Sequence, residues 1–152
     1  MASTIYKDAG AGAGSDTTLT LNNFSGFHVE IDTPSESFAD IGGDEEDAVL
    51  ISMLGTTMKL SFGWSVVDEA ANVVSGVGSP VTTAIGQAKY LIDTLKSAGA
   101  SAILDSYTVT LDFGGGVTIV RSGKLVKLTV DQASDEPITY KAHAEFLIGA
   151  VF

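Results

Sequence analysis

The stretch Thr57–Val66, which reads TMKLSFGWSV, decides the fold class of this chain. Its large apolar side chains recur at every second residue from Met58 to Val66, and polar or small residues stand between them. Successive side chains of a β-strand point to opposite faces, so this alternation predicts a strand with one buried face. Gly55 can end or bend that strand, which leaves 48–54 as a possible separate strand.

The same period of two residues appears on both sides of this stretch. It predicts further strands at Thr17–Leu21, Phe27–Asp32, Tyr107–Phe113, Val117–Asp131 and Ile138–Ile148. Turn-forming residues separate them, namely Asn22 and Asn23, Gly114–Gly116 and Ala133–Pro137. Within the longest of these strands, Val126, Leu128 and Val130 are expected on one face.

One segment, about residues 83–98, has the period of a helix. Thr82 or Thr83 is suited to cap its start, and Gly99 to close its end. The apolar stripe consists of Ala84, Ala88, Leu91, Leu95 and Ala98, widened on one side by Ile85 and Ile92. The sequence therefore predicts a mainly β protein, an antiparallel β-sandwich or barrel of about seven strands with one flanking α-helix.

The length of 152 residues corresponds to a single domain, 1–152. Segment 9–16, AGAGAGSD, has too little side chain to pack and is expected to be a flexible arm. Segment 68–81 is expected to be a loop that is mobile in the free chain. Its valines are unusual for an exposed loop and favour ordering against a neighbouring molecule.

The charge of the chain limits its partners. Nineteen acidic and eight basic residues give a formal net charge of −11. A surface of that sign repels nucleic-acid phosphates and anionic membranes. The acids are concentrated before residue 70, above all in the run Asp44–Asp47. There is no cysteine, which excludes disulfides and thiolate chemistry.

The sequence predicts no catalytic, cofactor-binding or metal site, and therefore a protein that is not an enzyme. The two histidines, His28 and His143, are expected on polar strand faces as solvated or interface residues. A metal site or a proton relay with Glu30 or Glu145 is the less favoured alternative. The run Asp44–Asp47 lacks the alternating ligands and central glycine of a calcium loop.

Apolar residues also occur where a monomer would carry charge, in the loop from Val73 to Val81 and at the terminus from Phe146 to Phe152. Such patches mark surfaces that another chain covers, so the residues favour self-assembly. The candidate contacts between subunits are Val73, Val74, Val77, Val81, Phe146, Val151 and Phe152.

The order of elements from Tyr90 to Val151 is distinctive. A helix is followed by the strand Tyr107–Phe113, a glycine turn, a long strand, an acidic turn with proline and the strand Ile138–Phe146. This succession resembles the tail tube (major tail) proteins of long-tailed bacteriophages, related viruses and contractile injection systems. The resemblance implies a structural virion protein, assembled in the host cytoplasm, whose subunits form stacked hexameric rings in the tail.

The resemblance also implies a set of partners. These are further copies of the chain, other tail proteins, and DNA that passes through the tube without tight binding, with no membrane and no cofactor. An acidic channel wall suits this role because it gives the phosphates no cations to displace. The candidate lumen-facing acids are Glu30, Asp32, Asp44, Glu45, Glu46 and Asp47.

A second hypothesis comes from a different class of protein. A monomeric β-barrel that binds a small ligand would have the same alternating strands. In that case the aromatic residues Phe62, Trp64 and Tyr107 would line a cavity, whereas a core stripe is the favoured interpretation of Phe62 and Trp64.

Overall fold

The computed structural model of the chain describes residues 3–8, 16–21, 24–32, 56–68, 72–96 and 105–151, with the backbone alone at 56 and 149–151. Its eight strands form one sheet in the order β3-β4-β8-β7-β6-β1-β2-β5. Every neighbouring pair is antiparallel. The strands are β1 (Ser3–Asp8), β2 (Thr17–Leu21), β3 (Ser25–Asp32), β4 (Thr56–Val66), β5 (Val73–Ser75), β6 (Ser106–Gly114), β7 (Val117–Asp135) and β8 (Ile138–Val151).

These strands and one helical segment confirm the predicted mainly β class with antiparallel pairing. Two of the strands, β1 and β5, were not expected from the sequence. The buried face of β1 has Ile5 as its one apolar residue, between Ser3 and Lys7, and the strand pairs with both β2 and β6. β5 has only three residues, too few for a period to be recognised. The possible strand at 48–54 and the arm at 9–15 lie outside the described residues.

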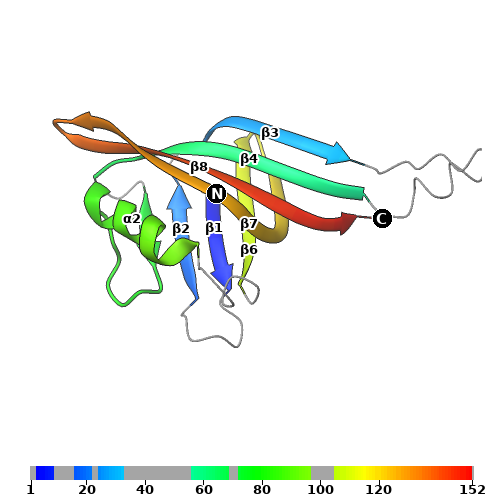
Figure 1. The fold of residues 1–152 in the computed structure, drawn as a ribbon, viewed down its shortest axis with the longest axis horizontal. Coiled ribbons are helices and arrows are strands. Elements are labelled where there is room, and N and C mark those ends of the chain that lie inside the picture. The colour runs from blue at the N-terminus through cyan, green and yellow to red at the C-terminus, as the bar shows by residue number, and fades with distance from the viewer. Residues whose placement is uncertain are drawn as a thin grey trace, which may run out of the picture.

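The long strand β7 bends at Gly123, and this bend divides the sheet in two. Residues before Gly123 pair with β6, residues after it pair with β8, and Gly123 itself stands opposite both Tyr107 and Ile148. Figure 1 shows β7 turning away from the long strands and running down to β6. We call β3, β4, β8 and residues 124–135 of β7 the long half-sheet. The short half-sheet comprises residues 117–123 of β7 with β6, β1, β2 and β5.

The hydrophobic core lies between the two half-sheets. The largest buried rings come from the long half-sheet, where Phe62 and Phe146 stack with centroids 5.9 Å apart and Trp64 lies 5.7 Å from Phe62. The short half-sheet contributes buried aliphatic residues such as Ile5 and Leu111. Alternation in the strands therefore produces the core that the sequence predicts. The predicted core aromatics Phe62 and Trp64 are buried in it, and so is Tyr107.

The helix covers one side of this core. It begins as α2 (Ala84–Tyr90), widens into the π-helical turn η1 (Leu91–Leu95), and ends at Lys96, which is extended. Thr83 is the cap, since its hydroxyl accepts the N–H of Gly86 at 3.1 Å. The predicted stripe residues Ala84, Ala88, Leu91 and Leu95 are buried, and Ala98 and Gly99 lie outside the described residues.

Three expectations about surfaces need correction. Ile85 and Ile92 do not widen the buried stripe, because they are 58% and 67% exposed. Val126 does not share the inner face of β7 with Leu128 and Val130, because a bulge between Leu125 and Lys127 shifts the register. Leu125 takes the buried position instead, and Val126 is exposed.

Part of the segment 68–81, which the sequence predicts as a loop, is a strand: β5 pairs with β2, and Val74 forms two backbone hydrogen bonds with Val81. The side chain of Val74 is fully buried, so contacts within the same chain already hold β5.

Candidate assembly surface

Strand β3 is an edge strand whose two faces are both open. Among the described strands it pairs only with β4, and its exposed residues include the candidate lumen acids Glu30 and Asp32. Ile31 lies on its inner face opposite Met58 and is 63% exposed, although it is a large apolar residue. An edge of this kind presents unpaired backbone groups that another strand can bond.

A second open edge lies on the other side of the long half-sheet. Among the described strands, residues 124–135 of β7 pair only with β8, because β6 ends its pairing at Gly123. The long half-sheet thus has β3 at one edge and the free part of β7 at the other. Figure 1 shows β3 and β7 on opposite sides of β4 and β8.

Charges on the outer face of the long half-sheet are arranged in opposed pairs. Glu30 stands opposite Lys59, Glu145 opposite Lys127, and Asp131 opposite Lys141. Opposite charges in such cross-strand positions stabilise a sheet by roughly 0.2–1 kcal/mol per pair. This outer face is therefore close to charge balance among the described residues, with Asp32 opposite Thr57 as an acid without a facing lysine.

The excess of acidic over basic residues lies in another part of the sequence. The segment 33–55, between the end of β3 and the start of β4, contains six acidic residues and no basic residue. Four of the candidate lumen acids, Asp44, Glu45, Glu46 and Asp47, fall in it and lie outside the described residues. The strand faces in the described part of this half-sheet therefore carry little of the acidic excess.

The two histidines lie on the same outer face but do not form a metal or catalytic site there. Nε2 of His28 is 4.0 Å from Oε1 of Glu30, both side chains being exposed, and His143 stands opposite Gly63 on β8. In the part of the chain that the structure describes, no three histidine or acidic side chains are grouped closely enough to hold a metal ion.

Two of the predicted contact residues are not on the surface. Val74 and Phe146 are fully buried within their own chain, so neither can form a subunit contact while the chain is folded. Phe146 belongs to the alternating core face of β8, which the sequence could have indicated from its neighbours Ala144 and Ile148. Val73 and Val81 are half-buried and Val77 is exposed, while the side chains of Val151 and Phe152 lie outside the described residues.

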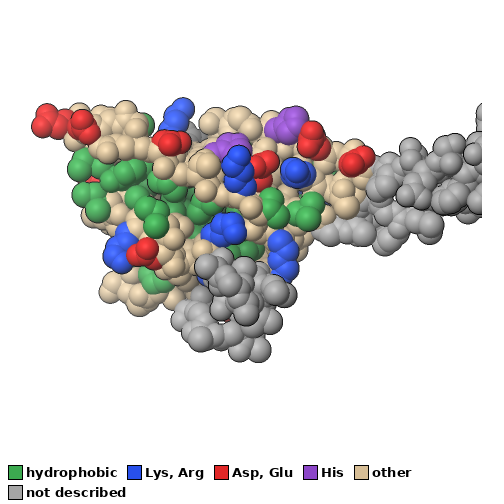
Figure 2. Space-filling view, viewed as in Figure 1, with side chains coloured by type: hydrophobic (Ala, Val, Ile, Leu, Met, Phe, Trp, Pro, Cys, Tyr) green, Lys and Arg blue, Asp and Glu red, His purple; other side chains and the backbone are tan. Residues whose placement is uncertain are grey.

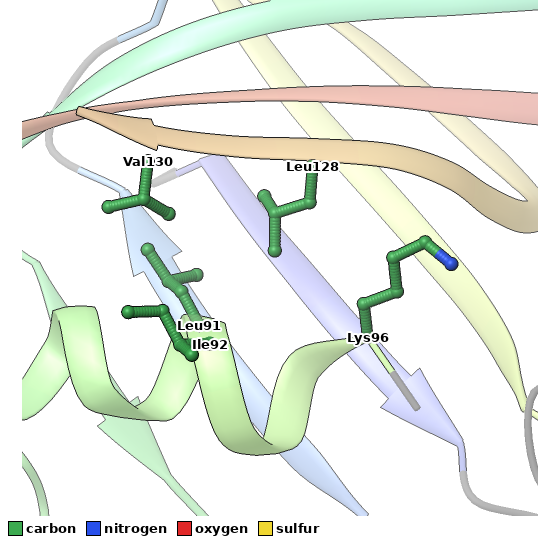
Figure 3. Close-up of a pocket in the computed structure, with 5 residues that line it drawn as sticks. All are labelled: Leu91, Ile92, Lys96, Leu128 and Val130. Carbon is green, nitrogen blue, oxygen red and sulfur yellow. The ribbon is translucent and has the colours of Figure 1, made fainter. Parts of the chain in front are cut away.

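An apolar groove lies directly beside the free edge of β7. It has a volume of about 320 Å³ and is lined by Leu91, Ile92, Lys96, Leu128 and Val130. Figure 2 shows apolar side chains gathered between the long strands and the helix. In Figure 3, Leu128 and Val130 point from β7 toward the helix, with Lys96 at one end of the groove.

A buried ion pair, which no pattern in the sequence indicates, holds the end of the helix next to this groove. Nζ of Lys7 lies 3.6 Å from Oδ2 of Asp105, with both side chains 5% exposed, and it donates a hydrogen bond to the carbonyl of Thr94. Nζ of Lys124 donates to the carbonyl of Asp105. These contacts join β1, η1, β7 and the residue that precedes β6 at one point.

Comparisons with known proteins add no relative. No protein-family model matches the chain, and no curated protein or solved structure is detectably similar to it. Among the described residues, no helix has the length and apolar character needed to cross a membrane.

Proposed function

We propose that this chain is a tail tube subunit, a structural and non-enzymatic virion protein that assembles into stacked hexameric rings and forms a conduit for DNA. The observation that carries the proposal is the pair of open edges on the long half-sheet. Among the described strands, β3 has no partner on one side, and residues 124–135 of β7 have none on the other.

The long half-sheet has four strands of alternating direction, so the sheet can continue from one copy of the chain into the next. Its order is β3, β4, β8 and β7, each antiparallel to the next. Because the number of strands is even, the two edge strands β3 and β7 run in opposite directions. A second copy, rotated about an axis parallel to the strands, therefore places its β3 antiparallel to the β7 of the first copy. Such head-to-tail contacts generate a closed ring when the rotation closes, and they leave no strand edge exposed.

In this arrangement the outer face of the long half-sheet forms the channel wall. The opposed lysines and acids of that face give it little net positive charge. DNA binds basic surfaces by releasing counterions, so a balanced wall lets it pass without being held. The acidic segment 33–55, attached to the ends of β3 and β4, adds further repulsion. The partners are then further copies, other tail proteins and transient DNA, in a virion assembled in the host cytoplasm.

The alternative, a monomeric β-barrel that binds a small ligand, has one observation in its favour, the apolar groove beside the helix. However, the aromatics that this hypothesis assigned to a cavity pack together in the core, where Phe62 and Tyr107 contact Phe146 and Trp64 contacts Phe62. The groove has a different set of lining residues.

Light scattering of the purified full chain over a range of concentrations tests the proposal. We expect a mass of several chains that grows with concentration as rings stack. A mass of one chain at every concentration would refute the tube function, and native mass spectrometry of that monomer with a bound small molecule would establish the alternative.

A further inference from the structure

We propose that the groove between η1 and β7 is the docking site for the apolar face of β3 from a second copy of this chain. The inference rests on the proposed function and specifies the contact that would build it. The face in question carries Phe27, Val29 and Ile31, and the receiving residues are Leu91, Ile92, Lys96, Leu128 and Val130.

The position of the groove is the first argument. Leu128 and Val130 line it from the inner face of β7, and the neighbouring free edge of β7 is the place where an added strand would form hydrogen bonds. A strand added there continues the sheet, so its inner-face side chains come to lie beside Leu128 over the helix (Figure 3). A side chain in that position would cover Ile92, which is 67% exposed in the single chain.

The apolar character of β3 is the second argument. Its inner face continues the core face of β4, with Val29 opposite Leu60 and Ile31 opposite Met58. At one end Phe27 packs on Phe113, with ring centroids 5.1 Å apart, but Ile31 at the other end remains largely uncovered. An edge strand with an uncovered apolar face is complementary to an apolar groove beside an open edge.

Charge complementarity is the third argument, and it favours a second copy over an unrelated partner. β3 contains two carboxylates, Glu30 and Asp32, and no lysine or arginine. In the free part of β7, Lys124 and Lys127 lie toward Gly123, whereas Asp131 and Asp135 lie toward the other end, and Lys96 adds a cation at the groove. The acidic β3 is therefore complementary in charge to the end of the free edge that carries Lys124 and Lys127, which steers it to that end.

Two exposed isoleucines of the helix provide a matched pair of variants. Ile92 lines the groove, whereas Ile85, 58% exposed, does not. We expect Ile92→Glu to raise the concentration required for assembly by about tenfold or more, because it places a charge in an apolar contact. Ile85→Glu should leave that concentration within about twofold of the unmodified chain, since surface substitutions have small effects. Equal behaviour of the two variants would overturn the inference.

Cysteine cross-linking tests the identity of the occupant, since the chain has no cysteine of its own. Chains carrying Ile92→Cys are mixed in turn with chains carrying Phe27→Cys, Val29→Cys or Ile31→Cys, and then oxidised. A linked dimer in at least one mixture, without such a link when Ile85→Cys replaces Ile92→Cys, is expected.

The outcomes separate this inference from the function on which it rests. Rings that form without any of these links, and that tolerate Ile92→Glu, would refute the groove contact and leave the tube function standing. A chain that remains a monomer under all conditions would refute both. Circular dichroism and thermal unfolding of each variant exclude misfolding as the cause of lost assembly.

Discussion

A Cβ atom placed on Gly123 would lie only 2.3 Å from the carbonyl oxygen of Leu147. At this point β7 leaves β8 and joins β6, and the backbones approach so closely that only glycine fits. The bend also creates the free edge of β7, because β6 pairs only with the residues up to Gly123. One residue without a side chain therefore shapes both the core and the proposed assembly surface.

The first prediction concerns this bend. Gly123→Ala should lower the free energy of unfolding by about 3 kcal/mol, because backbone atoms of β8 would have to move to admit the methyl group. Urea unfolding followed by circular dichroism measures the change. Thr118→Ala, at an exposed position earlier in β7, is the control and should cost well under half as much. Similar losses for both variants would show that the close approach at Gly123 is not required.

The buried ion pair provides the second prediction. Removing one partner leaves a buried charge without its counterion, so Lys7→Met should destabilise the chain by about 3–5 kcal/mol. The double variant Lys7→Met with Asp105→Leu removes both charges and should recover part of that loss. Denaturant unfolding of the two single variants and the double variant gives the coupling energy. Strict additivity of the two single effects would contradict the pairing of Lys7 with Asp105.

The helix cap provides the third prediction, and the sequence left two candidates for it. Thr83→Ala removes the hydroxyl that accepts the N–H of Gly86 and should cost about 1 kcal/mol. Thr82→Ala keeps the carbonyl that accepts a hydrogen bond from Gln87 and should cost much less. Thermal unfolding of the two variants distinguishes them, and the reverse order would contradict the assignment of the cap.

The fourth prediction concerns alkaline pH. Burial raises the pKa of Tyr90 above its usual value of 10.0, although its hydrogen bond with Thr17 opposes the shift. The folded chain therefore keeps this proton at a pH where the unfolded chain has lost it. The associated stability is complete below the usual pKa and declines as the pH rises above it. Tyr90→Phe should show a smaller decline than the unmodified chain when unfolding is measured at about pH 9 and pH 11. An equal decline in the variant and the unmodified chain would show that Tyr90 does not contribute to the loss of stability.

Charge reversal provides the fifth prediction. Lys127 lies on the free part of β7, whereas Lys141 lies on β8 inside the half-sheet, and each faces one acid of the same chain. Lys127→Glu should weaken assembly several-fold, with partial recovery at high salt, because the approaching β3 is acidic. Lys141→Glu makes the same change in net charge and should assemble nearly as well. Sedimentation at low and high salt compares the two variants. An equal loss of assembly in both would argue against a contact at the free edge of β7.

Much of the fold could be predicted because alternation is a local signal. The periods of β4, β6 and β8 identified both the strands and the buried faces, because apolar side chains mark the buried face of a strand and polar side chains mark the exposed face. The predicted face of Val126 is wrong because a bulge interrupts the period of β7. The predicted burial of Ile92 is wrong because the apolar stripe of a helix does not show how far the sheet beneath it extends. Both errors depend on neighbours that are distant in the sequence.

The assembly surface was harder to predict than the core. The exposed valines and the apolar terminus pointed to self-association, yet Val74 and Phe146 proved to be internal. The open edges of β3 and β7 become visible only when the strand order is known, because an edge is a property of the sheet rather than of the strand. The pairing of Glu145 with Lys127 likewise depends on register, which composition does not contain.

Electron microscopy of the purified full chain, at a concentration where light scattering finds the largest species, tests the central claim most directly. We expect closed rings with a central channel and short tubes made of stacked rings, with six subunits in each ring as the tail tube resemblance implies. A field of uniform particles the size of one chain, with no rings or tubes, would contradict it.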